Sequence, residues 1–390
     1  MRKEGTLSMK LLKIIFNILL LIVTLIVPKS KKYIVIGGWE GKRFADNSKG
    51  MFEYLTENMD NLGLVRVFWY TKDKKIYQQL KEKGYDVLFG LNLRSIFWHL
   101  RSKIHFIDQN PHDILGFLSI RTTRINLWHG VPLKKIGIDI IPGYKPKNEL
   151  LRKFSSGGFW RDQYIVAPSQ LAASLLGHAM EIKKEKWLIA SYPRNSRLYN
   201  NYLEKKDDIS PFNVYYLPTF RNQDDNNRNP ILDSDIEDFN SRLKENNIVF
   251  HVKPHFASKS DWNKLSQYSN IDIIASQEDV YGALLETDLL ITDYSSVYFD
   301  YLLTNKPILF FPYDLDFYAQ EERGFYMDYD QITPGKKVYS YEEFVDNLET
   351  IRKDMMSYIK QYEKQYQEVR NITNQYQETP NYDAILELLK

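Results

Sequence analysis

The chain has 390 residues, which is enough for two or three domains and for a large hydrophobic core. Hydrophobic residues make up 43% of it and charged residues 26%, which excludes a disordered tail or a fibre. Cysteine is absent, so disulfide scaffolds, thiolate metal sites and a cysteine nucleophile are excluded as well. Because 52 basic residues face 50 acidic ones, no global positive field marks a nucleic-acid binder. The composition favours a cytoplasmic or cytoplasm-facing globular enzyme.

The amino-terminal segment combines a basic excess with a long apolar run. The first fifty residues hold ten Lys or Arg and three Asp or Glu. The run Ile14–Val27 is apolar except for two polar residues, and the lysines on both sides of it suit anionic headgroups. As a helix it rises about 21 Å, which is less than the roughly 30 Å hydrocarbon core of a bilayer. We therefore expect residues 1–32 to be a membrane-associating segment.

This segment is expected to hold the protein at the cytoplasmic face of the cell membrane, peripherally or anchored by residues 11–27. The run is short for a comfortable span, and the sequence does not separate a spanning helix from an interfacial one. A secretory signal is one alternative, but the run ends in Pro28-Lys29 without an A-x-A-like cleavage site. A buried amino-terminal helix is the other alternative.

Beyond this segment, short apolar stretches alternate with helical ones, which predicts the α/β class with parallel sheets covered by helices. The first series of expected strands is Tyr33–Ile36, Leu64–Tyr70, Ile104–Ile107, Ile125–Trp128 and Tyr164–Ala167. The second series is Val214–Leu217, Ile248–Val252, Ile271–Ile274, Asp288–Thr292 and Pro307–Phe311. Expected helices include Lys74–Lys83, Ser169–His178 and Ser296–Thr304. Two series imply two such α/β domains, at 33–200 and 201–390, because the polar stretch Asn195–Pro211 separates them.

Ligands of open α/β sheets bind beyond the carboxyl ends of the strands, and four polar motifs lie at such positions. The first follows the strand that ends at Trp128 and contains His129 and Gly130. A histidine there could act as general base on a hydroxyl, and the glycine lets the backbone approach a ligand. Lys134 and Lys135 could meet phosphate charge. The alternative is a structural histidine packed beside Trp128, but residues 101–161 hold eleven basic and four acidic residues, which suits an anionic acceptor.

The other three motifs lie in the second series. Lys253-Pro254-His255 follows one strand, and its alternative interpretation is a plain solvated loop. Ser295-Ser296 precede a helix whose amino terminus favours phosphate, although either serine could simply be the N-cap. Arg221, in Pro218-Thr219-Phe220-Arg221, could fork onto phosphate oxygens or pair with the acidic loop at Asp224-Asp225.

Metal and cofactor motifs are missing from the sequence. The histidines show no HExxH spacing, and neither a P-loop, a G-x-S-x-G elbow nor a G-x-G-x-x-G fingerprint occurs. Asp293 is the only candidate for a metal-binding carboxylate, so we expect a metal-independent site without a cofactor. The Tyr-rich stretch from Tyr358 to Tyr376 has near-helical spacing and predicts a packing surface.

Several stretches together carry a resemblance that runs from about Gly41 to Leu348. They are Asp46-Asn47, WHGVPLKKIG at 128–137, YPRN at 192–195, PTFR at 218–221, KPH at 253–255, TDYSSVYFD at 292–300, YDLDFY at 313–318 and RGFYMDY at 323–329. In this order they resemble the CDP-glycerol glycerophosphotransferase family of bacterial teichoic-acid and capsule polymer synthesis. The resemblance implies a GT-B fold of two Rossmann-like domains, an acceptor domain and a CDP-polyol donor domain, with a cleft between them. It also implies attachment to the membrane surface.

The resemblance also implies an activity and a set of site residues. The enzyme would transfer glycerol phosphate from CDP-glycerol to an anionic, lipid-linked acceptor and release CMP. His129 and His255 would be catalytic. The substrate-binding residues would be Gly130, Val131, Pro132, Leu133, Lys134, Arg194, Pro218, Thr219, Arg221, Lys253, Pro254, Ser295, Ser296, Asp300 and Arg323.

In the expected reaction an acceptor hydroxyl attacks the phosphorus that bears the glycerol, and positioning and electrostatics supply most of the catalysis. We assign His129 as general base, although the sequence does not single out its acidic partner. His255, Ser295, Ser296 and Arg221 would hold the pyrophosphate.

Several alternatives stay open at this point. Relatives that use CDP-ribitol share nearly the same motifs, and the chain is shorter than family polymerases with a large amino-terminal extension. Single-unit and polymerising transfer are therefore both compatible with the sequence. A nucleotide-sugar glycosyltransferase on the same fold and a non-catalytic membrane-tethered binder are the alternatives from other classes.

Overall fold

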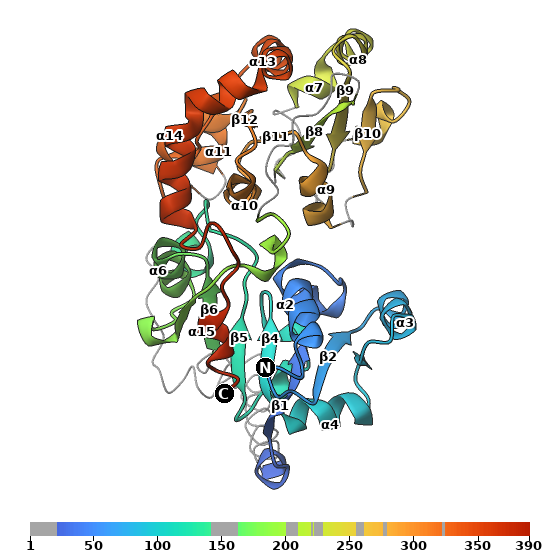
Figure 1. Ribbon diagram of the computed structural model, residues 1–390, viewed down its shortest axis with the longest axis vertical. Coiled ribbons are helices and arrows are strands. Elements are labelled where there is room, and N and C mark those ends of the chain that lie inside the picture. Colours follow the sequence, from blue (N-terminus) through green and yellow to red (C-terminus); the bar gives the residue numbers. More distant parts are fainter. Residues whose placement is uncertain are drawn as a thin grey trace, which may run out of the picture. The chain divides into compact units, whose positions relative to one another are not determined.

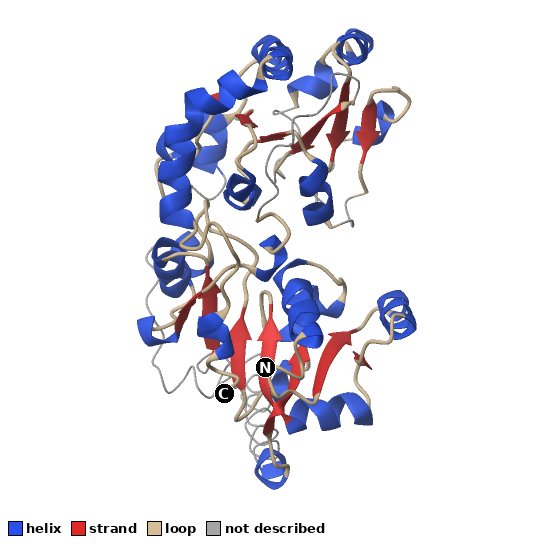
Figure 2. Cartoon of the chain, viewed as in Figure 1, coloured by secondary structure: helices blue, strands red, loops and turns tan. Residues whose placement is uncertain are grey.

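The computed structural model describes residues 22–141, 163–199, 210–219, 221, 229–254, 261–275, 279–321 and 324–390. The chain forms two compact units, each with a sheet and surrounding helices (Figures 1 and 2). Unit 1 comprises residues 1–129, 137–196 and 380–390, and unit 2 comprises residues 130–136 and 197–379. All recorded strand pairs of the two sheets are parallel, which confirms the predicted α/β class with parallel sheets.

Unit 1 contains a seven-stranded sheet in the order β3-β2-β1-β4-β5-β6-β7. Its strands are β1 (Ser30–Ile36), β2 (Arg66–Thr71), β3 (Val87–Phe89), β4 (Ser102–Ile107), β5 (Thr123–Asn126), β6 (Gln163–Ala167) and β7 (Trp187–Ile189). The central strand β1 ends in Ile34, Val35 and Ile36, which are fully buried. A parallel strand covered on both faces needs such a continuous apolar run, so the sequence pattern and the central position agree.

Four of the helices of unit 1 lie between strands of its sheet, and three of these begin at polar caps. The helices of the unit are α2 (Asp46–Glu57), α3 (Lys74–Glu82), α4 (Leu93–Arg101), α6 (Gln170–Ala179) and α15 (Asp383–Leu386), with 3₁₀ turns η1 (Trp39–Gly41), η2 (Pro111–Asp113), η3 (Gly116–Leu118), η4 (Gly137–Ile140), η5 (Lys184–Lys186) and η6 (Pro193–Asn195). Asp73, Asn92 and Ser169 accept backbone N–H bonds at the starts of α3, α4 and α6. These caps satisfy N–H groups that have no partner inside the helix.

Unit 2 contains a six-stranded sheet in the order β10-β9-β8-β11-β12-β13. Its strands are β8 (Phe212–Leu217), β9 (Ile248–Val252), β10 (Ile271–Ile273), β11 (Leu289–Thr292), β12 (Ile308–Phe310) and β13 (Lys336–Lys337). Its helices are α7 (Pro230–Asp233), α8 (Ile236–Glu245), α9 (Val280–Glu286), α10 (Val297–Tyr301), α11 (Leu315–Glu321), α12 (Tyr329–Ile332), α13 (Tyr341–Lys353) and α14 (Met355–Thr373), with 3₁₀ turns η7 (Trp262–Leu265) and η8 (Leu302–Thr304).

The tyrosines of α14 fasten this helix to the sheet of unit 2. Tyr358 donates to the carbonyl of Ile308 at 2.6 Å, and the hydroxyl of Tyr366 accepts the N–H of Ile308 at 2.8 Å. The two tyrosines are eight residues apart and therefore lie on one face of the helix. The predicted packing role of the Tyr-rich stretch is confirmed for these two residues.

The structure differs from the sequence expectations at strand ends and sheet edges. Strands β3, β7 and β13 are absent from the sequence expectations; each has two or three residues and lies at the edge of a sheet. Strand β5 ends at Asn126 because Trp128 has a left-handed φ of +54°. The predicted helix 296–304 consists of α10 followed by η8.

The amino-terminal prediction lies mostly outside the described residues, since only residues 22–32 of the segment are among them. Residues 22–26 form a short helix that precedes β1. Across the part of the chain that the structure covers, no helix has both the length and the apolar character to span a bilayer.

Two neighbouring histidines are buried in the core of unit 1. His99 Nδ1 lies 2.6 Å from the Ser95 carbonyl, and its Nε2 accepts the N–H of Leu115 at 3.2 Å. His105 bonds to the Ser119 hydroxyl at 2.9 Å and to the His99 carbonyl at 3.2 Å. Burial lowers the pKa of His99 to about 4, and burial together with the charge of His99 lowers the pKa of His105 well below its ordinary value.

These two histidines predict a loss of stability in acid. Between pH 6.5 and about 4, the unfolded chain binds protons that the folded chain rejects, so the free energy of unfolding falls as pH falls, by at most about 1.4 kcal/mol per pH unit and histidine. His105→Gln should reduce this dependence, measured as urea midpoints from pH 7 down to 4.5. The matched control is His112→Gln at an exposed position. The same pH slope in both variants would contradict the interpretation.

Candidate active site

Three segments of unit 1 meet around the main chain that precedes His129. Asn47, at the start of α2, donates through Nδ2 to the Trp128 carbonyl at 2.8 Å. Its Oδ1 accepts the N–H of Arg194 at 3.2 Å, which links α2 to η6. The packing is close, because a Cβ at Gly50 would lie 2.6 Å from the carbonyl carbon of Pro193. The start of α2 and η6 thus hold the backbone that presents His129.

Arg194 adds an ion pair to this arrangement. Its Nη1 donates to Asp46 Oδ1 at 2.7 Å and to the His129 carbonyl at 2.9 Å. Both side chains are buried, at 5% and 9% exposure, so the pair is little screened by solvent. The structure therefore places Arg194, which was predicted to bind substrate, as a support of His129.

Unusual backbone conformations flank the histidine and the carboxylate. Asp46 has a φ of +66° and Trp128 a φ of +54°, values that residues other than glycine rarely adopt. Gly130, directly after His129, has a φ of +144°. Such strained residues persist only where the surroundings hold them, and they concentrate at functional sites. The hydrogen bonds of Asn47 and Arg194 supply that restraint here.

His129 is partly exposed as a residue, but its Nδ1 is buried and has no hydrogen-bond partner among the described residues. The ring centroid lies 4.0 Å from that of Trp128. Burial lowers the pKa of His129 to about 4, while the charge of Asp46 raises it and the charge of Arg194 lowers it. The imidazole is consequently neutral at neutral pH, and a neutral imidazole has one nitrogen that can accept a proton.

Three carboxylates of unit 1, those of Asp46, Asp108 and Asp113, lie close enough to interact electrostatically. Asp113 accepts four backbone N–H bonds, among them those of Glu40 at 2.7 Å and Gln109 at 2.8 Å. Asp108 accepts the N–H of Ser48 at 2.9 Å, and burial followed by the charges of Asp46 and Asp113 raises its pKa well above the ordinary value. Asp46 is the acidic neighbour of His129 that the sequence did not identify. Asp108 also went unnoticed in the sequence, although its position directly after the expected strand Ile104–Ile107 could have indicated it.

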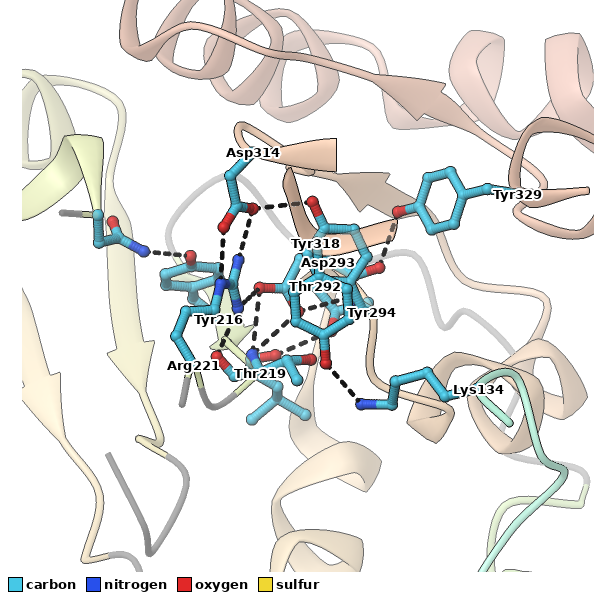
Figure 3. Close-up of polar contacts among 12 residues, drawn as sticks. Lys134, Tyr216, Thr219, Arg221, Thr292, Asp293, Tyr294, Asp314, Tyr318 and Tyr329 are labelled. Atoms are coloured by element: carbon cyan, nitrogen blue, oxygen red, sulfur yellow. Dashed lines mark hydrogen bonds and ion pairs between the residues drawn. The ribbon is translucent and has the colours of Figure 1, made fainter. Parts of the chain in front are cut away.

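Arg221 is the centre of the corresponding network in unit 2 (Figure 3). Its Nε and Nη2 donate to the two oxygens of Asp314 at 2.9 and 2.8 Å, and its Nη1 donates to Asp293 Oδ2 at 2.8 Å. Burial alone would lower the pKa of Arg221, but the charge of Asp293 and the hydrogen bonds of Asp314 outweigh it and raise the pKa. All three guanidinium nitrogens thus donate to protein oxygens, and the predicted contact of Arg221 with phosphate stays a prediction. The alternative partners Asp224-Asp225 lie outside the described residues.

Aromatic rings surround this guanidinium. Arg221 Cζ lies 5.0 Å from the ring centroid of Tyr294 and 5.1 Å from those of Tyr313 and Tyr318. Tyr294 and Tyr318 stack at 3.9 Å, and the Tyr294 hydroxyl donates to Asp314 at 2.8 Å. Cation–π contacts of this kind strengthen when they are desolvated, so the rings reinforce the ion pairs.

The segment Gly130–Ile136, which follows His129 directly, is fastened to the same network. Lys134 Nζ donates to the Tyr318 hydroxyl at 3.2 Å (Figure 3). The carbonyl of Leu133 accepts the N–H of Tyr326 at 3.0 Å, and Lys135 donates its N–H to Gly324 at 3.1 Å. The chain therefore leaves unit 1 at the histidine and enters unit 2 within one residue.

The structure places the other predicted site residues at the carboxyl ends of the strands of unit 2 or inside the unit. Val131, Pro132 and Leu133 are buried, and Pro218-Thr219 follow β8. The N–H of Thr219 donates to Asp293 at 2.9 Å. Its buried Oγ1 has no partner in the ranges that the structure covers.

The other predicted site residues of unit 2 differ in the hydrogen bonds that they make. Ser295 Oγ accepts the N–H of Val297 at 3.4 Å, whereas Ser296 is the N-cap of α10 without a side-chain cap bond. Asp300 is buried and accepts the Tyr281 hydroxyl at 2.7 Å. Lys253 donates its N–H to the Tyr216 carbonyl at 3.1 Å, with Pro254 beside it. His255 and Arg323 lie outside the described residues.

Asp293 was the one metal candidate. Its carboxylate accepts the N–H groups of Thr219 and Tyr294 besides Arg221, so protein donors already surround it. Within the described ranges, no group of three or more His, Asp or Glu side chains has the arrangement of a metal site.

The network around Arg221 predicts a large stability loss on truncation. Arg221→Ala leaves two buried carboxylates without their counter-charge, and breaking a buried pair costs about 3–5 kcal/mol. The control is Arg242→Ala, whose pairs with Glu349 and Asp346 are more exposed and whose loss should cost within about 1 kcal/mol. Urea unfolding followed by circular dichroism measures both. Equal losses would contradict the central role of Arg221.

The sequence matches the family "CDP-Glycerol:Poly(glycerophosphate) glycerophosphotransferase" over residues 19–389. A teichoic acid glycerol-phosphate transferase of Staphylococcus aureus (strain NCTC 8325 / PS 47) is 30% identical over 359 residues, which are 85% of this chain and 86% of the relative. A teichoic acid poly(glycerol phosphate) polymerase of Bacillus spizizenii is 26% identical over 393 residues, covering 96% of this chain and 93% of the relative.

A solved structure of the wall teichoic acid polymerase TagF has a TM-score of 0.73 at 21% identity and covers 99% of this chain and 97% of that one. At this identity the likeness shows the fold, while the match along the sequence shows the family. The chain is therefore a member of the CDP-glycerol:poly(glycerophosphate) glycerophosphotransferase family and an enzyme of glycerol phosphate transfer.

Proposed function

We propose that this enzyme transfers glycerol phosphate from CDP-glycerol to a lipid-linked acceptor of the teichoic-acid or capsule type and releases CMP. The observation that carries the proposal is the neutral, partly buried His129, whose carbonyl and electrostatic surroundings are set by Arg194 and Asp46. The relatives named for glycerol-phosphate transfer support the donor. A structure of the wall teichoic acid polymerase TagF with CDPG supports it in the same way.

His129 is proposed to take the proton of the attacking hydroxyl. The oxygen of the acceptor forms a bond to the phosphorus that bears the glycerol, the bond from this phosphorus to the CMP oxygen breaks, and the proton moves to the imidazole. A pKa of about 4 keeps the ring unprotonated before the reaction. The carboxylate of Asp46 stabilises the imidazolium that forms, because an opposite charge nearby favours the charged state.

Unit 2 is proposed to bind the CDP-polyol. Lys253, His255, Ser295 and Ser296 would hold the pyrophosphate and stabilise the leaving CMP, and Thr219 Oγ1 is a buried hydroxyl that a ligand could satisfy. Arg221 would act indirectly, because its pair with Asp293 fixes the backbone of Thr219. The catalytic role of His255, the binding role of Arg323 and the independence of metal remain predictions.

The arrangement of the domains is part of the proposal. The acceptor domain would comprise residues 33–200 and the donor domain residues 201–390, in the GT-B arrangement that the resemblance implies. Attachment to the cytoplasmic face of the membrane through residues 11–27 would bring the enzyme to its lipid-linked acceptor.

CDP-ribitol is the second candidate donor. A teichoic acid poly(ribitol-phosphate) polymerase of Bacillus spizizenii is 29% identical over 305 residues, 69% of this chain and 47% of the relative. Incubation with each CDP-polyol and a lipid-linked acceptor, with CMP followed by chromatography, separates the two. CMP from CDP-glycerol alone supports the proposal, and CMP from neither donor contradicts it.

His129→Ala should lower the rate of CMP release strongly. Loss of a general base typically lowers turnover by about 10²–10⁴-fold. The hydrogen bonds of Asn47 and Arg194 end on the carbonyls of Trp128 and His129, which the substitution leaves in place. The control is His178→Ala, whose side chain is largely exposed. A variant that keeps more than about a tenth of wild-type kcat would refute the assignment.

The pH dependence of Arg194 variants tests how His129 is supported. Because the charge of Arg194 lowers the pKa of His129, Arg194→Gln should move the acid limb of kcat/KM to higher pH. Arg194→Lys keeps the positive charge but loses the planar guanidinium. Its kcat should therefore fall while the acid limb stays at the wild-type pH. An unmoved acid limb in Arg194→Gln would reduce Arg194 to a packing role.

A further inference from the structure

Large apolar side chains are exposed on two segments of unit 1. Of the thirteen exposed large hydrophobic residues found in the described ranges, seven belong to residues 22–26 and 91–97. Leu93 is 86% exposed and Ile26 76%. Single exposed apolar residues are ordinary, but a gathering of this kind marks an interaction surface.

The two segments adjoin each other in space. Val27 packs with Ile96 and Trp98 against the same core cluster. Lys29 Nζ donates to the Leu100 carbonyl at 2.8 Å, and the Arg101 guanidinium donates to the Pro28 carbonyl. In Figure 1 the short helix of residues 22–26 and α4 lie at the same end of unit 1.

Helix α4 carries large apolar residues on its outer side. Ser95, His99 and Leu100 face the core and are buried. Leu93 and Phe97 are one helical turn apart and exposed, whereas a surface helix normally carries polar residues there. The outer side of α4 therefore suits contact with an apolar environment other than the core of unit 1.

The charge around this surface is uniformly basic. Residues 22–32 and 91–103 contain six lysines and arginines and no acidic residue, and Arg94 has Asp86 at 3.5 Å as a neighbour. Burial, followed by the charges of Lys103 and Arg121, lowers the pKa of Lys29 to about 8. Anions would relieve this repulsion, and a bilayer with anionic headgroups offers both the charge and the apolar phase.

We propose that residues 22–32 and α4 form one bilayer-binding surface, in which Leu93 and Phe97 enter the acyl boundary and the basic residues meet lipid phosphates. The proposal rests on the membrane location in the proposed function and extends it to α4. The continuity with the apolar run Ile14–Val27 and the complementary charge favour a bilayer over a protein partner.

The test is co-sedimentation of the full-length chain with phosphatidylcholine vesicles, with and without phosphatidylglycerol, over a lipid titration. Leu93→Ser/Phe97→Ser should weaken binding to the anionic vesicles about tenfold or more, because two apolar anchors are lost. The matched control is Met356→Ser/Ile372→Ser on α14, which removes exposed apolar residues from unit 2 and should leave binding within about twofold.

A wild-type chain that stays in the supernatant with both vesicles would overturn the proposal and point to a protein partner. Equal binding of wild type and Leu93→Ser/Phe97→Ser would remove α4 from the surface, and equal binding to both lipid compositions would remove the anionic requirement. Unchanged near-ultraviolet circular dichroism shows that the variants fold. Sedimentation needs no turnover, so a chain that binds vesicles but releases no CMP contradicts the proposed function and leaves this surface supported.

Discussion

A buried arginine whose charge is cancelled by carboxylates from distant stretches of the chain organises each unit. In unit 1, Arg194 pairs with Asp46, which is 148 residues away in the sequence. In unit 2, Arg221 pairs with Asp293 and Asp314, 72 and 93 residues away. A charge in a water-poor interior is costly unless it is paired and fully hydrogen-bonded, so each arginine forces its partner segments into register. The positions of the chemical groups at the strand ends follow from these pairs.

The central strands could be predicted from the sequence, because strands covered on both faces must be apolar along their length. The run ending in Ile34, Val35 and Ile36 is an example. Edge strands such as Lys336–Lys337 carry no such pattern, since one side faces no neighbour and two residues give no period. The end of β5 was misjudged because nothing in the sequence announces the left-handed φ of Trp128.

The sequence pointed to polar motifs at strand ends, but not to the contacts that their side chains make. Motif residues at strand ends were found because parallel strands direct their carboxyl ends to one edge. Arg221 was expected to bind phosphate because its partner Asp314 lies far away in the sequence, and no local pattern reveals a long-range ion pair. Asp46 belonged to a recognised stretch, yet its electrostatic effect on His129 depends on a contact that only the fold creates.

The direction of β1 has a consequence for the length of the acceptor. Its amino end joins residues 22–29, and its carboxyl end points to the edge where β4 and β5 lead to His129. Seven residues of strand separate the two ends by about 20 Å. With residues 22–32 resting on a bilayer, a hydroxyl at the height of the headgroups would fall short of the histidine by this distance. On the proposed membrane contact, an acceptor would therefore need a spacer of about this length between its lipid anchor and its reactive hydroxyl.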